Sequence, residues 1–169
     1  MFISGSGPVK VSKFVNDIRK AATRARRDAE SIRIVIAVAV IIDDTDEKAQ
    51  AKYRDYLSYV DEEVLALFGG CTGQDLSKFS DDDDFKFTGP ALVQSLVSLW
   101  SDTVPGNDGL KRTKSRLAIE LSIGEVHPRI VGSPKTVADW LQNWYDMSGV
   151  DGFNPGGAIS ADNCVYLVL

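Results

Sequence analysis

A nearly continuous apolar run from Ile32 to Ile42 constrains the fold of this chain more than any other feature. It reads IRIVIAVAVII, and most of its residues are β-branched. Such side chains favour strands, and a strand that is apolar at almost every position is covered on both faces. Strands of this kind occur in parallel sheets with helices packed against them. The run therefore predicts a buried parallel strand in an α/β protein.

The segments on either side of this run alternate between strand and helix patterns. We expect the end of a strand at residues 1–4, helices at 11–27, 45–68 and 134–147, and a strand at 150–154. A loop rich in Gly, Ser and Asp (69–90) and two short helices (91–100 and 113–123) separate the second of these helices from the third. This alternation predicts one α/β domain with parallel strands.

Composition and charge exclude several classes of function. The net charge of −5 gives no electrostatic reason to expect nucleic acid as a partner. The two cysteines, Cys71 and Cys164, form neither a disulfide framework nor a metal-ligand cluster, so no metal site is expected. No apolar run is long enough to span a bilayer and no signal peptide is recognised. We expect a cytoplasmic protein that has no membrane partner.

Few residues suggest chemistry from their local pattern. The one histidine, His127, precedes a proline, where a structural role is more common than catalysis. Ser133, followed by Pro134, is typical of a helix N-cap. Helix N-termini also bind phosphates, so Ser133 is either a cap or an anion ligand, and we favour the cap. The short GSG at residues 5–7 lacks the spacing of a nucleotide-binding fingerprint.

Three longer motifs resemble one family of enzymes. They read SIRIVIAVAVIIDDTDEKAQAKYRDYLSYVD, FGGCTGQDLSKF and HPRIVGSPKTVADWLQNWYDMSGVDGFN. They resemble the bacterial luciferase-like flavin-dependent monooxygenases, and most closely the branch with nitrilotriacetate monooxygenase component A and dibenzothiophene-sulfone monooxygenase. The resemblance covers residues 1–154 and leaves 155–169 as an atypical tail. It implies an α/β fold that is the C-terminal part of a (β/α)8 TIM-type barrel, with about three strands and a helical insertion at about 43–130.

The resemblance also implies an activity, a cofactor and partners. It implies a two-component monooxygenase that takes reduced flavin mononucleotide (FMN) from a separate flavin reductase and uses O2 and a small organic substrate. A whole barrel needs about 250 residues, so we expect this chain to be a truncated copy. The family's flavin-phosphate loop is expected ahead of Met1.

Candidate site residues follow from the same resemblance. The catalytic residues stay unknown. The cofactor-binding candidates are the residues at strand ends, namely Ser4, Val40, Ile42, Phe153 and Asn154. The insertion is expected to cover the substrate, with Cys71 and Phe79 as candidates.

Two alternative functions stay open. The chain could be a non-catalytic interaction or regulatory fragment that docks on a full barrel. It could also be an independently folded α/β domain whose likeness to the monooxygenases is ancestral. Unpaired strand edges template association, so we also expect the chain to self-associate.

Overall fold

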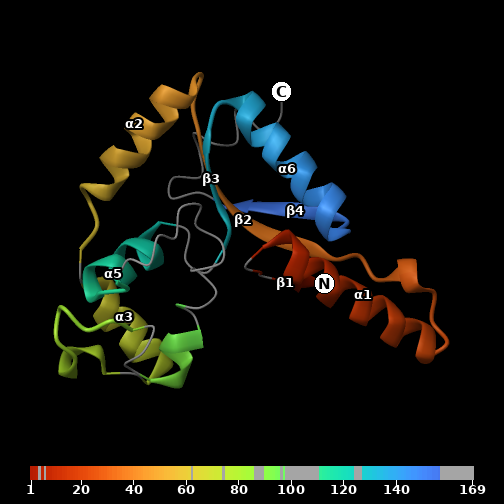
Figure 1. Cartoon of the computed structure of the whole chain (residues 1–169), viewed down its shortest axis with the longest axis horizontal. Coiled ribbons are helices and arrows are strands. Elements are labelled where there is room, and N and C mark those ends of the chain that lie inside the picture. The colour runs from red at the N-terminus through yellow and green to blue at the C-terminus, as the bar shows by residue number, and fades with distance from the viewer. Residues whose placement is uncertain are drawn as a thin grey trace.

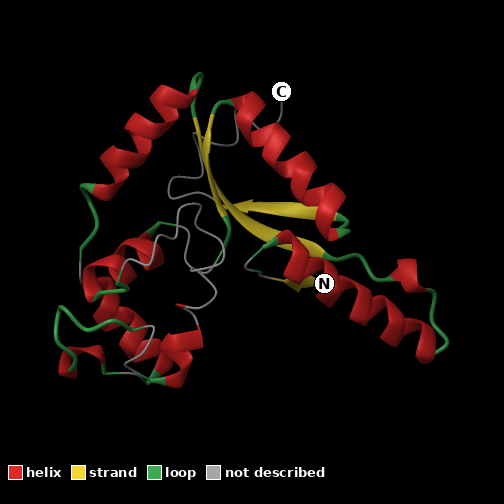
Figure 2. Ribbon diagram, viewed as in Figure 1, coloured by secondary structure: helices red, strands yellow, loops and turns green. Residues whose placement is uncertain are grey.

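A computed structural model describes residues 1–3, 5, 7–61, 63–73, 75–85, 90–95, 97, 111–123 and 127–156. It has a central parallel sheet with helices on two sides (Figures 1 and 2). Helices α1 (Pro8–Arg24) and α6 (Pro134–Ser148) lie on one side. Helices α2 (Asp46–Leu57), α3 (Glu63–Thr72) and α5 (Lys114–Ser122) lie on the other. The predicted α/β class is confirmed, while the predicted tail from residue 157 onwards lies outside the described residues.

Strand β2 (Val35–Ile42) is the centre of the sheet and is hydrogen-bonded along both edges. Its first residues pair with β1 (Phe2–Ile3) and its last four with β3 (Arg129–Gly132). The amides of Val35 and Ala39 donate hydrogen bonds to the carbonyl groups of Met1 and Pro128. Amides four residues apart on a strand point to the same edge, so β1 and β3 lie along the same edge of β2, one after the other. Strand β4 (Gly152–Gly156) pairs with residues 35–39 along the opposite edge.

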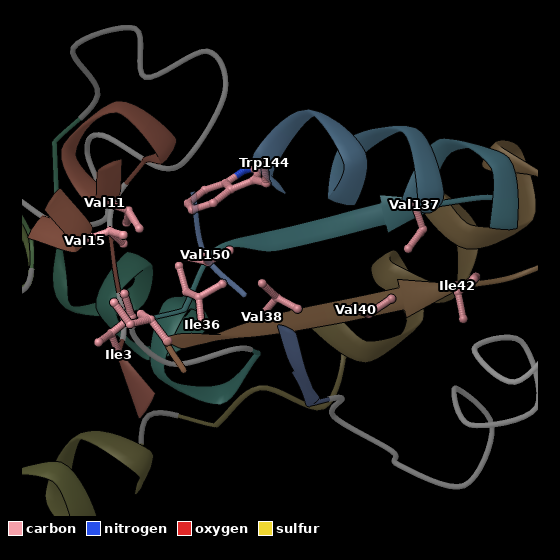
Figure 3. Packing of buried hydrophobic residues seen from close by; sticks show 11 residues of the cluster. Ile3, Val11, Val15, Ile36, Val38, Val40, Ile42, Val137, Trp144 and Val150 are labelled. Atoms are coloured by element: carbon pink, nitrogen blue, oxygen red, sulfur yellow. The ribbon is translucent and has the colours of Figure 1, made fainter. Parts of the chain in front are cut away.

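The even-numbered side chains of β2 form the main core together with α1 and α6. Ile36, Val38, Val40 and Ile42 are almost completely buried there. Figure 3 shows them in one row, with Val137 and Trp144 of α6 near them. Burial of apolar side chains between a sheet and two helices is the main driving force of this half of the fold. The predicted buried parallel strand is confirmed.

The segment between β2 and β3, which we call the insertion (residues 43–128), has a small core of its own. Its buried cluster draws on α3, α5 and the loops near them, with Leu65, Leu76, Phe85, Val93, Val97, Leu117 and Ala118. Residues 91–95 are helical, and a 3-10 turn, η2, spans Leu76–Lys78. The part of the insertion from α3 to α5 therefore has a hydrophobic core separate from that of the sheet.

Two local predictions are wrong. The chain has a strand, β3, where the sequence predicts only a lead-in to a helix, because four residues are too few to show a strand period. The helix predicted at 45–68 is two helices, since α2 ends at Leu57 and α3 begins at Glu63. The Asp61 carboxylate accepts a hydrogen bond from the Glu63 amide (2.9 Å) and so caps the start of α3.

The start of the sheet is fixed by the carboxylate of Asp151, which precedes β4. It accepts a hydrogen bond from the Ile34 amide (2.8 Å) and pairs with Arg33 (3.0 Å) and Arg19 (3.4 Å). Its side chain is only 13% exposed. Burial by itself raises the pKa of Asp151, but the Ile34 hydrogen bond and the two arginine charges outweigh it and hold the pKa below its usual value.

Asp151→Asn should lower the free energy of unfolding by about 1–3 kcal/mol near neutral pH, because the buried amide and arginine contacts lose a charged acceptor. The folded-state pKa of Asp151 lies below the unfolded one. The stabilisation is therefore present above an unfolded pKa of about 4 and is lost as pH falls through the folded pKa. Urea unfolding near pH 7 and at about pH 3 should show the difference between wild type and variant shrinking in acid.

The matched control is Asp146→Asn, on the exposed side of α6. It removes the same charge without touching the sheet and should change stability by less than about 0.5 kcal/mol. An effect of Asp151→Asn no larger than that of the control would contradict the role of Asp151.

Candidate functional site

The face of the sheet that turns away from α1 and α6 carries small or exposed residues near β1 and β4. In parallel strands, residues in register share a face, and Phe2, Gly152, Asn154 and Gly156 are in register with odd-numbered residues of β2. Phe2 is 74% exposed, and Asn154 and Gly156 are also exposed. We call this surface the open face, and it consists of Phe2, Val35, Ala37, Gly152, Asn154 and Gly156.

The open face leaves free space above its glycines. A Cβ added at Gly152 or at Gly156 would approach no atom closer than about 3.9 Å. Ala37, between them across β2, contributes only a methyl group. The surface is therefore a shallow, mostly apolar floor of backbone and small side chains, with one amide, that of Asn154.

The insertion covers the continuation of this face toward the end of β2. Ala39 and Ile41 are buried, and Arg129 is in register with Ala39. Arg129 Nη1 donates to Tyr53 Oη of α2 (3.0 Å), and Nη2 donates to Glu120 Oε2 of α5 (2.9 Å). Toward the C-terminal end of β2, the open face is thus bounded by the contacts of Arg129 with the insertion.

The N-terminus of α6 is capped by Ser133, as predicted, and it also holds a carboxylate from this chain. Ser133 Oγ accepts from the Thr136 amide (3.3 Å), while Asp46 of α2 accepts from the Ser133 amide (2.6 Å) and from Thr136 Oγ1 (3.0 Å). The Ser133 amide and the Thr136 hydroxyl lower the pKa of Asp46. A Cβ at Gly132 would lie 2.6 Å from Thr136 Cγ2, so only glycine fits beside this junction.

The carboxylate of Asp46 fills the place that a phosphate would take at this helix end. The question whether Ser133 caps the helix or binds an anion is therefore answered in favour of the cap. The residue that decides it, Asp46, is 87 positions away from Ser133. Nothing in the local motif could have identified it.

The structure separates the predicted cofactor residues. Val40 and Ile42 are fully buried between the sheet and its helices, and Phe153, in register with Ile36, packs against the same core. These three side chains face away from the open face. Asn154, also predicted, lies on the open face, and Ser4 lies outside the described residues. Their contact with a cofactor stays a prediction.

The two candidates for covering the substrate lie in the insertion. The ring of Phe79 packs edge-on against Phe85 at a centroid distance of 5.4 Å, and Phe85 is part of the insertion core. For Cys71 only the backbone is described, and it lies in α3. Their role in covering a substrate stays a prediction.

The insertion also contains a cavity, in a part of the chain away from the open face. Its volume is about 520 Å³, and Leu65, Gly70, Gly73, Leu76 and Lys114 are among its lining residues. In the part of the chain that the structure describes, no group of three or more His, Cys, Asp or Glu side chains could hold a metal ion. Within the same part, no helix is long and apolar enough to cross a bilayer.

Comparison with known families decides what this sheet is part of. Residues 1–152 match the family model for luciferase-like monooxygenases. The chain belongs to this family. In a barrel the helices that connect successive parallel strands form the outer ring. Helix α1 connects β1 to β2 and α6 leads into β4, so their side of the sheet corresponds to the barrel's exterior and the open face to its interior.

Named relatives agree with this family. Dimethyl-sulfide monooxygenase from Hyphomicrobium sulfonivorans is 39% identical over 162 residues, which are 95% of this chain and 33% of the relative. Long-chain alkane monooxygenase from Geobacillus thermodenitrificans is 31% identical and covers 91% of this chain and 30% of the relative. Nitrilotriacetate monooxygenase component A from Aminobacter aminovorans is 27% identical over 83% of this chain and 31% of its own length.

Solved structures agree as well. The crystal structure of DmoA from Hyphomicrobium sulfonivorans superimposes with a TM-score of 0.85 at 34% identity and covers 99% of this chain and 35% of DmoA. The structure of the long-chain alkane monooxygenase LadA gives a TM-score of 0.71 at 28% identity, over 99% of this chain and 34% of LadA. The chain spans about a third of the length of these relatives. The predicted family and the barrel-derived fold class are confirmed.

The role of Ser133 as N-cap of α6 can be tested by its effect on stability. Ser133→Ala should lower the free energy of unfolding by about 0.5–2 kcal/mol, because an amide of the first turn loses its acceptor. From the sequence alone, Asp at position 133 would cap equally well. The structure predicts that Ser133→Asp destabilises instead, because its carboxylate would adjoin that of Asp46.

A double-mutant cycle tests this repulsion. Ser133→Asp should be clearly less harmful in an Asp46→Asn background, which removes the neighbouring charge. Thermal unfolding of the four proteins measures the coupling. Additive effects of the two substitutions would contradict the contact between Asp46 and the α6 N-terminus.

Proposed function

We propose that this chain forms part of an FMN-dependent, two-component monooxygenase, and that its open face is one wall of the flavin site. Membership in the luciferase-like monooxygenase family supports the reaction class. The single structural observation that supports the site is the floor around Ala37, Gly152 and Gly156, where side chains leave space on the barrel's interior side.

The residues of the open face fit one side of a flavin. The isoalloxazine ring is flat and largely apolar, and it needs a surface without protruding side chains. Ala37 and the two glycines offer that surface, and the exposed amide of Asn154 can donate to or accept from the polar edge of the ring. The ring's other side and its phosphate need residues from beyond this sheet. For Ser4, the proposed contact with the cofactor rests on the resemblance of the sequence to the family alone.

When bound in reduced form, the flavin would supply the electrons that activate O2 for transfer of one oxygen atom to an organic substrate. This chain's residues orient the ring against β2 and β4. The insertion, which lies over the end of β2 and β3, excludes water from that side. We propose a small organic substrate, O2 and a separate flavin reductase as partners, and the cytoplasm as location.

A chimera tests the proposal. The N-terminal two thirds of dimethyl-sulfide monooxygenase joined to this chain should bind FMN, measured by quenching of flavin fluorescence. Ala37→Leu in the chimera should weaken binding at least tenfold, because an isobutyl group would occupy the floor. Ala21→Leu, the same substitution at an exposed position on α1, should leave affinity unchanged.

A folded chimera that fails to bind FMN would contradict the proposed function. Tight binding by Ala37→Leu would contradict the assignment of the open face while leaving the function intact. The 169-residue chain alone should bind FMN weakly or not at all, since it provides one wall only.

A second candidate function is docking on another polypeptide, and the exposure of Phe2 favours it. Phe2 lies on the open face in β1, whose outer edge pairs with no strand among the described residues, so a partner can cover both this edge and the apolar side chain. We propose that the isolated chain self-associates through this surface. Size-exclusion chromatography should show oligomers that Phe2→Ser disperses. Tyr59→Ser, at a residue 78% exposed in the insertion, should not disperse them.

A further inference from the structure

We propose that the buried ion pair between Arg129 and Glu120 fixes the α3–α5 unit of the insertion against the sheet. Arg129 belongs to β3, and Glu120 belongs to α5. The pair thereby joins two parts of the molecule that have separate hydrophobic cores. The proposal concerns the fold of the chain, and it can be tested without flavin.

The two ends of the insertion are attached to the sheet differently. Helix α2 packs directly on β2 and β3, and it is tied to them by Asp46 at the α6 N-terminus and by Lys52 Nζ, which donates to the Ile42 carbonyl (3.3 Å). Helix α5 packs mainly on α3. A chain segment around residues 58–62 separates α2 from α3. The α3–α5 unit therefore depends on additional contacts for its position.

Arg129 is held in a fixed orientation. Its backbone follows Pro128, whose carbonyl accepts from the Ala39 amide of β2 (2.8 Å). Its guanidinium donates to Tyr53 Oη on one side and to Glu120 Oε2 on the other. Tyr53 thus orients the guanidinium from α2, which is itself anchored to the sheet. A preorientated cation makes a directional contact with the carboxylate.

The Arg129–Glu120 pair is buried. The side chain of Glu120 is 5% exposed and that of Arg129 is 13% exposed. The desolvation of both groups offsets much of their attraction, but removing Arg129 leaves the buried Glu120 carboxylate with Arg116 of its own helix as its counter-charge and with no ion pair to the sheet. The pair is therefore broken at a cost when the α3–α5 unit moves away from β3.

Arg116 supplies a matched control within α5. Its guanidinium lies 3.3 Å from Glu120 Oε1, so it contacts the same carboxylate as Arg129 does. Arg116 and Glu120 are on one helix and move together. Loss of Arg116 weakens a pair inside the unit, whereas loss of Arg129 removes the connection to the sheet.

Hydrogen exchange of the 169-residue chain, followed by mass spectrometry, tests the proposal. Arg129→Gln should speed exchange of amides 117–121 in α5 at least tenfold while β2 amides keep their protection. Arg116→Gln should change the same α5 amides by less than about threefold. Glu120→Gln should resemble Arg129→Gln, and the double variant should add little to either single one.

Two outcomes would overturn the proposal. One is equal acceleration in Arg129→Gln and Arg116→Gln, and the other is additive effects of Arg129→Gln and Glu120→Gln. If Arg129→Gln also speeds amide exchange in β2, the milder variants Arg129→Lys and Tyr53→Phe, which keep a cation at position 129, are compared with wild type instead. Faster exchange in α5 but not in β2 then supports the proposal. Exchange that is unchanged in α5, or that is faster to the same degree in α5 and β2, contradicts it. Failure of the chimera to bind FMN would leave these exchange results untouched.

Discussion

Hydrogen bonding along both edges of β2 is the constraint on which the rest of this structure depends. β1 and β3 share one edge in succession, and β4 takes the other. With both edges paired, the apolar side chains of β2 must be covered above and below. The even-numbered row takes α1 and α6 as its cover. The return of the chain as β3 brings both ends of the insertion to the last residues of β2 (Figure 1).

The two faces of β2 serve different purposes. The even-numbered face carries only β-branched side chains, which pack against α1 and α6. The odd-numbered face carries Ala37 and Ala39 between Val35 and Ile41, and glycines of β4 are in register with Val35 and Ala39. In the luciferase-like family the first face is the outside of a barrel and the second is the inside. Stability and the proposed flavin site are therefore built by alternate residues of the same strand.

Two of the polar contacts that attach the insertion to this sheet differ in their physics. Asp46 meets the N-terminus of α6 at the surface, where its exposed carboxylate accepts hydrogen bonds from the Ser133 amide and the Thr136 hydroxyl. Arg129 and Glu120 meet in the interior, where the desolvation of both groups offsets much of their attraction. The first junction holds α2 in place, and the second is the contact through which we propose that the rest of the insertion is positioned.

The sequence by itself determined the elements whose signal is local. The β-branched run 32–42 specifies a strand through side-chain shape, and Ser133–Pro134 specifies a helix start through one hydrogen bond and one fixed dihedral. Only the tertiary structure decided which face of β2 is inside. The run is apolar at both odd and even positions, so its period carries no direction, and Val40 could be assigned to either face. The tertiary structure likewise decided the partners Asp46–Ser133 and Tyr53–Arg129, because contacts between residues so far apart in the chain depend on how the insertion folds back on the sheet.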